Sequence, residues 1–104
     1  MRDCTLLIEQ ALSDGHTVSV WDGEAWAVKR SKNYHTIFSA CDAVDDVVRL
    51  LIRDNQGEKI GSVYVLDDGD TRSIIDHTDT PYLNRVMPYV ESWASNAFSN
   101  LDSY

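Results

Sequence analysis

Apolar and polar residues recur with two different periods along this chain, and each change of period predicts the boundary of an element of secondary structure. Apolar residues follow a helical spacing from Cys4 to Leu12, which predicts a helix over about residues 3–13. The pair Asp14-Gly15 then supplies a typical helix end.

A β-hairpin is predicted next, because polar and apolar residues alternate on both sides of the turn signal Asp22-Gly23. A loop of two residues would pair Val20 with Ala25, whereas a loop of three residues would pair Val20 with Trp26. We expect the second register, since it collects the large apolar side chains on one face and places Trp26 in the core.

A second helix and a three-stranded meander follow. Ser31 is a suitable N-cap for a helix whose apolar stripe extends from Tyr34 to Val44. Three strands are then predicted over Val47 to Arg53, about Lys59 to Leu66, and Thr71 to Asp76, separated by turns rich in Asp, Asn and Gly.

The last helix is predicted to begin at Asp79-Thr80-Pro81 and to end at about Ser99. Pro88 removes a backbone donor inside it, so we expect a kink or a break near Val86, just before Pro88. The chain is therefore predicted to form a single α+β domain over residues 1–104, in the order α-ββ-α-βββ-α, with an antiparallel five-stranded sheet packed against the helices.

The charge of the chain excludes some partners. Seventeen acidic residues against nine basic residues give a formal net charge of −8. Such a molecule repels phosphate backbones and anionic membranes, so we expect it to bind neither nucleic acid nor a membrane directly. The negative charge is concentrated towards the two ends of the chain, whereas residues 29–66 are nearly neutral. If the two ends meet in space, one face of the molecule will be strongly acidic.

The cysteines and the N-terminus indicate a cytosolic location. Cys4 and Cys41 lie on the first two predicted helices without a CxxC motif, which is typical of reduced core thiols. The N-terminus lacks the apolar run of a signal peptide, and no stretch approaches the roughly 20 apolar residues of a membrane helix.

Acidic residues are the first candidates for contact with a partner. At the hairpin tip, Trp21 and Trp26 lie beside Asp22 and Glu24, and a tryptophan next to carboxylates is able to anchor a partner that carries basic groups. The alternative is that Trp26 belongs to the core and that Asp22-Gly23 is ordinary turn chemistry. The acidic residues that we expect to contact a partner are Asp22, Glu24, Asp67, Asp68, Asp70, Asp76 and Asp79.

Aromatic residues of the last helix are the second set of candidates. This helix carries two adjacent apolar stripes, which is more than a helix lying on a sheet needs. The second stripe contains Tyr82, Tyr89 and Trp93, and Tyr and Trp are favoured at the centres of interfaces. Either the small domain buries both stripes, or the second stripe joins Trp21 as a partner or dimer surface.

Motifs of enzymes and metal proteins are missing from the chain. Nucleophile elbows, phosphate-binding glycine loops, dinucleotide fingerprints and paired metal-binding histidines do not occur. Asp67-Asp68-Gly69-Asp70 lacks the alternating acid spacing of a calcium loop, and Asp76-His77-Thr78-Asp79 is typical of turn and capping residues. We therefore expect no catalytic residue, no metal, no cofactor and no enzymatic activity.

The hairpin tip Val20-Trp21-Asp22-Gly23-Glu24, in a compact and aspartate-rich domain, resembles the small accessory proteins of bacteriophages and prophages, above all anti-CRISPR and anti-restriction inhibitors. The resemblance covers the general character of the whole chain and one segment of five residues. It implies a non-enzymatic inhibitor whose acidic surface engages the basic, nucleic-acid-binding site of a CRISPR effector or another defence complex in the bacterial cytosol. It assigns no role to any individual residue.

Two other functions fit the same pattern. An immunity protein or antitoxin would present the acidic surface to one cognate toxin. A homodimeric regulatory protein would use the C-terminal helix and would have a doubled mass in solution.

Overall fold

The computed structural model of the chain confirms the predicted α+β class and the predicted order of elements. It describes the backbone of residues 2–43, 47–67 and 72–102, and the side chains of residues 4–43, 47–66 and 74–91. The elements are α1 (Arg2–Ser13), β1 (Thr17–Trp21), β2 (Trp26–Ser31), α2 (Tyr34–Asp42), β3 (Val47–Arg53), β4 (Lys59–Asp67), β5 (Arg72–His77) and α3 (Pro81–Asp102).

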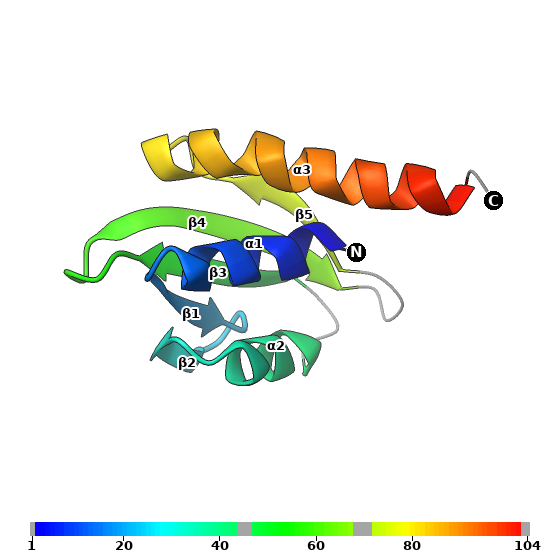
Figure 1. Cartoon of the computed structure of the whole chain (residues 1–104). Coiled ribbons are helices and arrows are strands. Elements are labelled where there is room, and N and C mark those ends of the chain that lie inside the picture. The colour runs from blue at the N-terminus through cyan, green and yellow to red at the C-terminus, as the bar shows by residue number, and fades with distance from the viewer. Residues whose placement is uncertain (1, 44–46, 68–71, 103–104) are drawn as a thin grey trace.

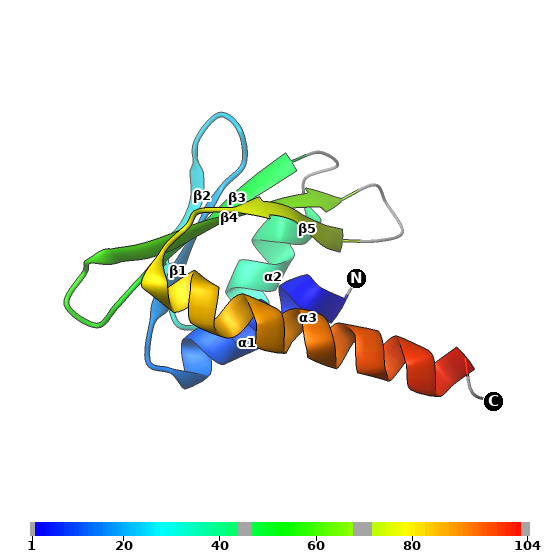
Figure 2. The same ribbon diagram turned by 90° about the horizontal axis from the view of Figure 1, so that it is seen from above.

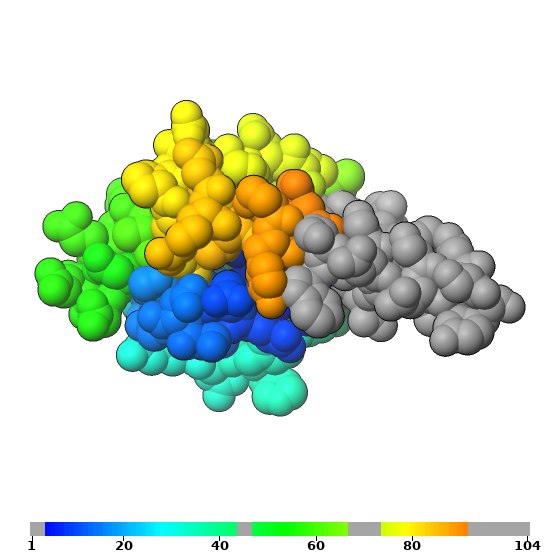
Figure 3. Space-filling model, turned by 45° about the horizontal axis from the view of Figure 1, so that its top comes forward, coloured from blue at the N-terminus to red at the C-terminus, as the bar shows by residue number. Residues whose placement is uncertain are grey.

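The strands form one antiparallel sheet in the order β2-β1-β3-β4-β5. The three helices lie on the same side of this sheet (Figures 1 and 2). On that side α1 lies between α2 and the first turns of α3 (Figure 3). The fold therefore has two layers, and within the described part of the chain no helix covers the second face of the sheet.

The hydrophobic core fills the space between the two layers. Alternate residues of the strands face the helices. The period of two predicted this for Val48, Leu50 and Ile52, and each of them is buried. Cys4 and Cys41 are buried there and form no disulfide bond, which confirms the prediction of core thiols for both. The other buried members of this core are Leu7, Ile8, Ala11, Val18, Val20, Ile37, Val63, Val65, Tyr82, Leu83, Val86, Met87 and Val90.

The start of α3 is fixed closely to β4. The Thr80 hydroxyl donates a hydrogen bond to the carbonyl of Ile60 over 2.8 Å and accepts one from the N–H of Leu83 over 3.4 Å, so Thr80 caps the helix as predicted. Leu83 lies directly over Gly61, where a Cβ atom would come within 2.6 Å of the leucine Cδ1 atom. A residue without a side chain at this position lets the helix approach the strand.

The predicted register of the first hairpin is wrong. Val20 pairs with Val28 and Trp21 pairs with Trp26, so the loop has four residues instead of three. Asp22 explains the difference, because its Oδ1 atom accepts hydrogen bonds from the N–H groups of Glu24 and Ala25 over 2.9 and 2.8 Å and closes the wider loop. As a result Trp26 lies against Trp21 and is not part of the core.

The start of α2 also differs from the prediction. Asn33, and not Ser31, caps α2, since its side chain accepts a hydrogen bond from the N–H of Thr36, while the Ser31 hydroxyl accepts one from the N–H of Asn33. Val44 lies outside the described residues.

The helix α3 extends beyond the predicted end, to Asp102, and it continues through Pro88 as one element (Figures 1 and 2). The ring of Pro88 is exposed, and so is Asn84, whose carbonyl loses the donor that Pro88 lacks. None of the described helices combines the length and the hydrophobicity that crossing a membrane requires.

Candidate functional site

The face of the sheet opposite the helices carries a row of aromatic and charged side chains. Cross-strand pairing aligns Trp21 of β1 with Arg49 of β3, Arg49 with Tyr64 of β4, and Tyr64 with Asp76 of β5. At the other end, Trp26 of β2 pairs with Trp21. We call Trp26, Trp21, Arg49, Tyr64 and Asp76 the aromatic row. It runs across all five strands on the open face.

Packing within the aromatic row holds its side chains in place. The rings of Trp21 and Trp26 meet edge to face, with centroids 5.2 Å apart and planes at 71°, an arrangement that aromatic pairs prefer. Arg49 donates a hydrogen bond from Nη2 to the hydroxyl of Ser62 over 3.2 Å. The side chains are half-buried except for Asp76, which is exposed, so they are ordered and still accessible.

Apolar side chains extend the surface beside this row. Val47 and Leu66 pair across β3 and β4 next to the Arg49–Tyr64 pair, and they are 37% and 38% exposed. On the other side of the row, Leu51 pairs with Ser19 and Ser62 and is only 2% exposed, although it does not belong to the main core. The open face thus combines an accessible apolar pair at one end of β3 and β4 with an ordered arginine.

The hairpin loop places carboxylates at the rim of this face. The N–H groups of Ala25 and Glu24 donate to Asp22 and lower the pKa of its carboxyl below the ordinary value. Asp22 is therefore a fixed negative charge that also closes the loop, and the exposed Glu24 follows it. The predicted neighbours Trp21, Trp26, Asp22 and Glu24 do lie together.

The remaining acidic candidates do not all gather at that rim. Asp76 is at the β5 end of the aromatic row and accepts a hydrogen bond from the N–H of His77 over 2.8 Å. Asp79 precedes α3 at the opposite end of the strands from the Asp22 loop, and it accepts a hydrogen bond from the side chain of Asn84. Asp67 ends β4 with its side chain outside the described part, and Asp68 and Asp70 lie outside it altogether.

Tyr82 is a core residue that the structure ties to α1 and the loop after it. It is 7% exposed, its hydroxyl donates to the Asp14 carboxylate over 2.7 Å, and its ring meets His16 edge to face at 4.7 Å. Burial and the hydrogen bond to Asp14 raise the pKa of Tyr82. Burial also raises the pKa of Asp14, but the hydrogen bonds from Tyr82 and Gln10 outweigh it, and the pKa lies below its ordinary value.

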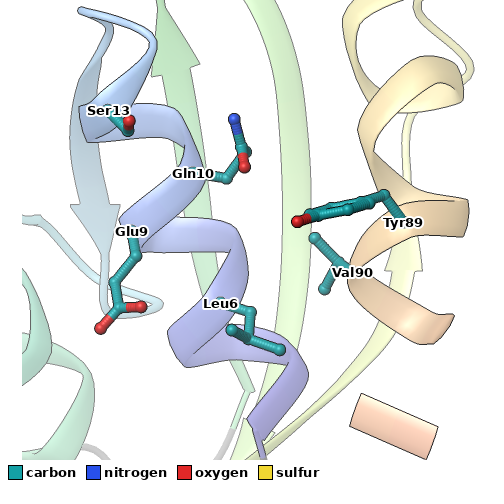
Figure 4. A pocket seen from close by; sticks show the side chains of 6 residues that line it. All are labelled: Leu6, Glu9, Gln10, Ser13, Tyr89 and Val90. Atoms are coloured by element: carbon teal, nitrogen blue, oxygen red, sulfur yellow. The ribbon is translucent and has the colours of Figure 1, made fainter. Parts of the chain in front are cut away.

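Tyr89 is accessible, in contrast to Tyr82. It is 55% exposed and leans across a hollow of about 310 Å³ between α3 and α1, towards Gln10 and Leu6 (Figure 4). The side chain of Trp93 lies outside the described residues. The domain thus buries the first members of the second α3 stripe, Tyr82 and Val86, but not Tyr89.

A second hollow, of about 400 Å³, brings polar groups together where α3 begins. Its lining includes His16, Lys59, Tyr82 and Arg85. The Tyr82 hydroxyl is already donated to Asp14, and its raised pKa keeps it protonated, so it is not poised as a base or nucleophile. Among the described side chains, no three of His, Cys, Asp and Glu are grouped to hold a metal ion.

Sequence reasoning did not single out Arg49 and Tyr64 as site residues, and it left Trp26 either in the hairpin-tip surface or in the core. The signal for Arg49 and Tyr64 was the same alternation that identified the core: if Val48, Leu50 and Ile52 face inward, Arg49 must face outward. Trp26 was assigned to the wrong face because the loop length was wrong.

No protein family model matches the chain, and neither the curated proteins nor the solved structures include one with significant similarity to it.

Proposed function

We propose that this chain is a non-enzymatic, protein-binding inhibitor that docks on its partner through the open face of its sheet. The observation that carries the proposal is the aromatic row, in which Trp26, Trp21, Arg49 and Tyr64 follow one another across four strands. Trp, Tyr and Arg dominate the energetic centres of protein interfaces. Here they are held by strands, by edge-to-face packing and by Ser62, so binding costs little side-chain entropy.

The charge around the row indicates the kind of partner. Asp22 and Glu24 border the two tryptophans, and the whole chain carries a net charge of −8. A partner with an apolar patch bordered by Lys and Arg is complementary to this arrangement, and the long-range field accelerates its approach. Proteins that bind nucleic acid present such basic surfaces. We therefore propose an anti-defence role of the anti-CRISPR type, in the cytosol of a bacterial host.

The proposal is tested with a panel of purified bacterial defence effectors and the immobilised chain. We expect one effector to be retained, and we expect the substitutions Trp21→Ala and Tyr64→Ala each to weaken its binding at least tenfold. Tyr89→Ala is the matched control, because it removes an exposed aromatic ring from α3 on the other side of the molecule. Charge reversal at Asp67, Asp68 and Asp70 is expected to weaken binding, most strongly at low salt.

The result that contradicts the proposal is equally specific. If Tyr89→Ala abolishes binding while Trp21→Ala and Tyr64→Ala leave it intact, the surface lies on α3 and not on the sheet. If sedimentation instead gives a doubled mass that Tyr89→Ala returns to 11.8 kDa, the homodimeric alternative replaces ours.

A further inference from the structure

A small hollow with a positive lining lies on the open face, next to the aromatic row. It has a volume of about 230 Å³ and is lined by Ser19, Trp26, Lys29, Arg30, Leu51 and Arg53. Three of these six residues are cationic and none is acidic. The hollow lies towards the Arg53 end of β3, whereas the carboxylates of Asp22 and Glu24 border the opposite end of the strands.

Two arginines of the hollow converge on the same turn. Arg53 donates from Nη1 to the carbonyl of Gly57 over 3.0 Å. The Nη1 atom of Arg30 lies 3.6 Å from the position that a Cβ atom on Gly57 would take. The guanidinium groups of Arg30 and Arg53 therefore both reach the β3–β4 turn. Two like charges that reach the same turn repel each other, and an anion bound near both would relieve the repulsion.

One donor of this pair is left over for a ligand. The Nε atom of Arg53 is buried and, within the part of the chain that the structure describes, has no hydrogen-bond partner. A buried donor without a partner is costly in a folded protein. A carboxylate seated beside Arg53 would accept this hydrogen bond and satisfy the donor.

The backbone at Arg30 is held in an uncommon conformation that aims this residue. Arg30 has φ of +48°, whereas the other positive φ angles in the described chain belong to glycines. Its N–H donates to the buried hydroxyl of Ser19 over 2.8 Å, at a point where the β1–β2 register shifts. Left-handed backbone at a non-glycine residue is strained, and such bulges often redirect a side chain near a functional site.

We propose that this hollow binds carboxylates of an acidic segment of the partner protein, with Arg30 and Arg53 as the charged donors and Trp26 as the apolar wall. The inference rests on the proposed function and names the charge that the partner brings to this end of the face. The partner then carries basic residues opposite Asp22 and Glu24 and acidic residues opposite Arg30 and Arg53. Opposite charges at the two ends of one face fix the direction in which it docks.

Carboxylates fit this site better than a nucleic-acid strand does. A strand extends its phosphates far beyond a hollow of about 230 Å³ and would meet the field of a protein with a net charge of −8. One or two carboxylates on a protein surface avoid this repulsion, and guanidinium groups bind them with paired hydrogen bonds.

The test uses hexaglutamate as the probe and follows the Nε–H signal of Arg53 and the indole N–H signal of Trp26 by NMR at low salt. We expect both signals to shift with saturation, and we expect Arg53→Gln to weaken binding about tenfold, as the loss of a charged hydrogen bond implies. Arg30→Gly is expected to weaken it as well without impairing the fold. Lys32→Gln is the matched control, because it removes one positive charge from an exposed residue that does not line the hollow.

The inference is overturned if neither signal shifts, or if Lys32→Gln weakens binding as much as Arg53→Gln. It is also overturned if hexathymidylate binds more tightly than hexaglutamate at the same salt concentration, which would assign the hollow to nucleic acid. The variants Trp21→Ala and Tyr64→Ala separate this site from the proposed function. If these variants lose capture of the effector but keep the affinity for hexaglutamate, both the proposed function and the anion site stand. If the unaltered chain captures no effector but binds hexaglutamate, only the anion site stands.

Discussion

The contact between Gly61 and Leu83 allows a quantitative prediction, because it sets how closely α3 approaches the sheet. In the variant Gly61→Ala, the new methyl group would lie 2.6 Å from Cδ1 and 2.7 Å from Cγ of Leu83, against about 3.5–4.0 Å for carbon atoms in contact. Leu83 is fully buried, so a shift of its side chain has to displace neighbours in the close-packed core. We expect a loss of about 2 kcal/mol in the free energy of unfolding, which is the usual range for an overpacked core.

The second half of this prediction concerns Leu83→Ala, which removes both of the atoms that would clash. This variant alone leaves a cavity and should cost about 2–5 kcal/mol. When Gly61→Ala is added to it, the cost of the methyl group should vanish or become a gain of up to about 1 kcal/mol. The reason is that Gly61 does not have a positive φ, and alanine restricts the unfolded chain.

Urea unfolding and thermal unfolding, both followed by circular dichroism, measure all four proteins of this double-mutant cycle. We expect Gly61→Ala to lower the melting temperature by roughly 10 °C in the wild-type background, since about 1 kcal/mol corresponds to about 4–8 °C in a domain of this size. We expect a coupling energy of about 2 kcal/mol between the two positions. If Gly61→Ala costs the same with Leu83 and with Ala at position 83, the close approach of the helix is not the reason for the glycine.

Three further predictions concern single residues. Tyr82→Phe should cost about 1 kcal/mol at neutral pH, because it removes the hydrogen bond to the Asp14 carboxylate. The pKa of Asp14 is lowered in the folded state, so this contribution is present above the ordinary value of 3.8 and is lost as the pH falls through the lower, folded value. Thermal melts of the two proteins should therefore still differ at pH 3.8 and converge only at lower pH. Arg30→Gly should raise the free energy of unfolding by up to about 1 kcal/mol by removing backbone strain, and a lower value would contradict that strain. Asp22→Ala should speed the hydrogen exchange of the Glu24 and Ala25 amides, and unchanged exchange would show that another group closes the loop.

The sequence predicted the elements well because local patterns and the core agree along most of the chain. The strand Val47–Arg53 was predicted with its bounds and its inward face, since apolar residues at every second position leave one arrangement that buries them. The first hairpin failed because its register depends on a side-chain hydrogen bond of Asp22, which no period of apolar residues reveals.

The candidate site was less accessible to sequence reasoning than the fold. Its rim was found, because Trp21 and Glu24 are close together in the chain. The aromatic row was not, since Trp21, Arg49 and Tyr64 come from three different strands and meet only through the pairing of β1, β3 and β4. Tyr82 was considered for a surface role because its burial depends on His16 and Asp14, which lie far away in the sequence.

The two outer strands of the sheet limit how another chain could join it. Strand β2 has two register shifts and presents the charged Lys29 and Arg30 along an edge with unpaired backbone groups, and β5 carries a shift next to the 53% exposed Ile75. Irregular and charged edges are poor templates for the addition of a further strand, and they protect against amyloid-like growth. If the proposed function holds, we expect the partner to approach the open face of the sheet instead of extending the sheet by backbone pairing.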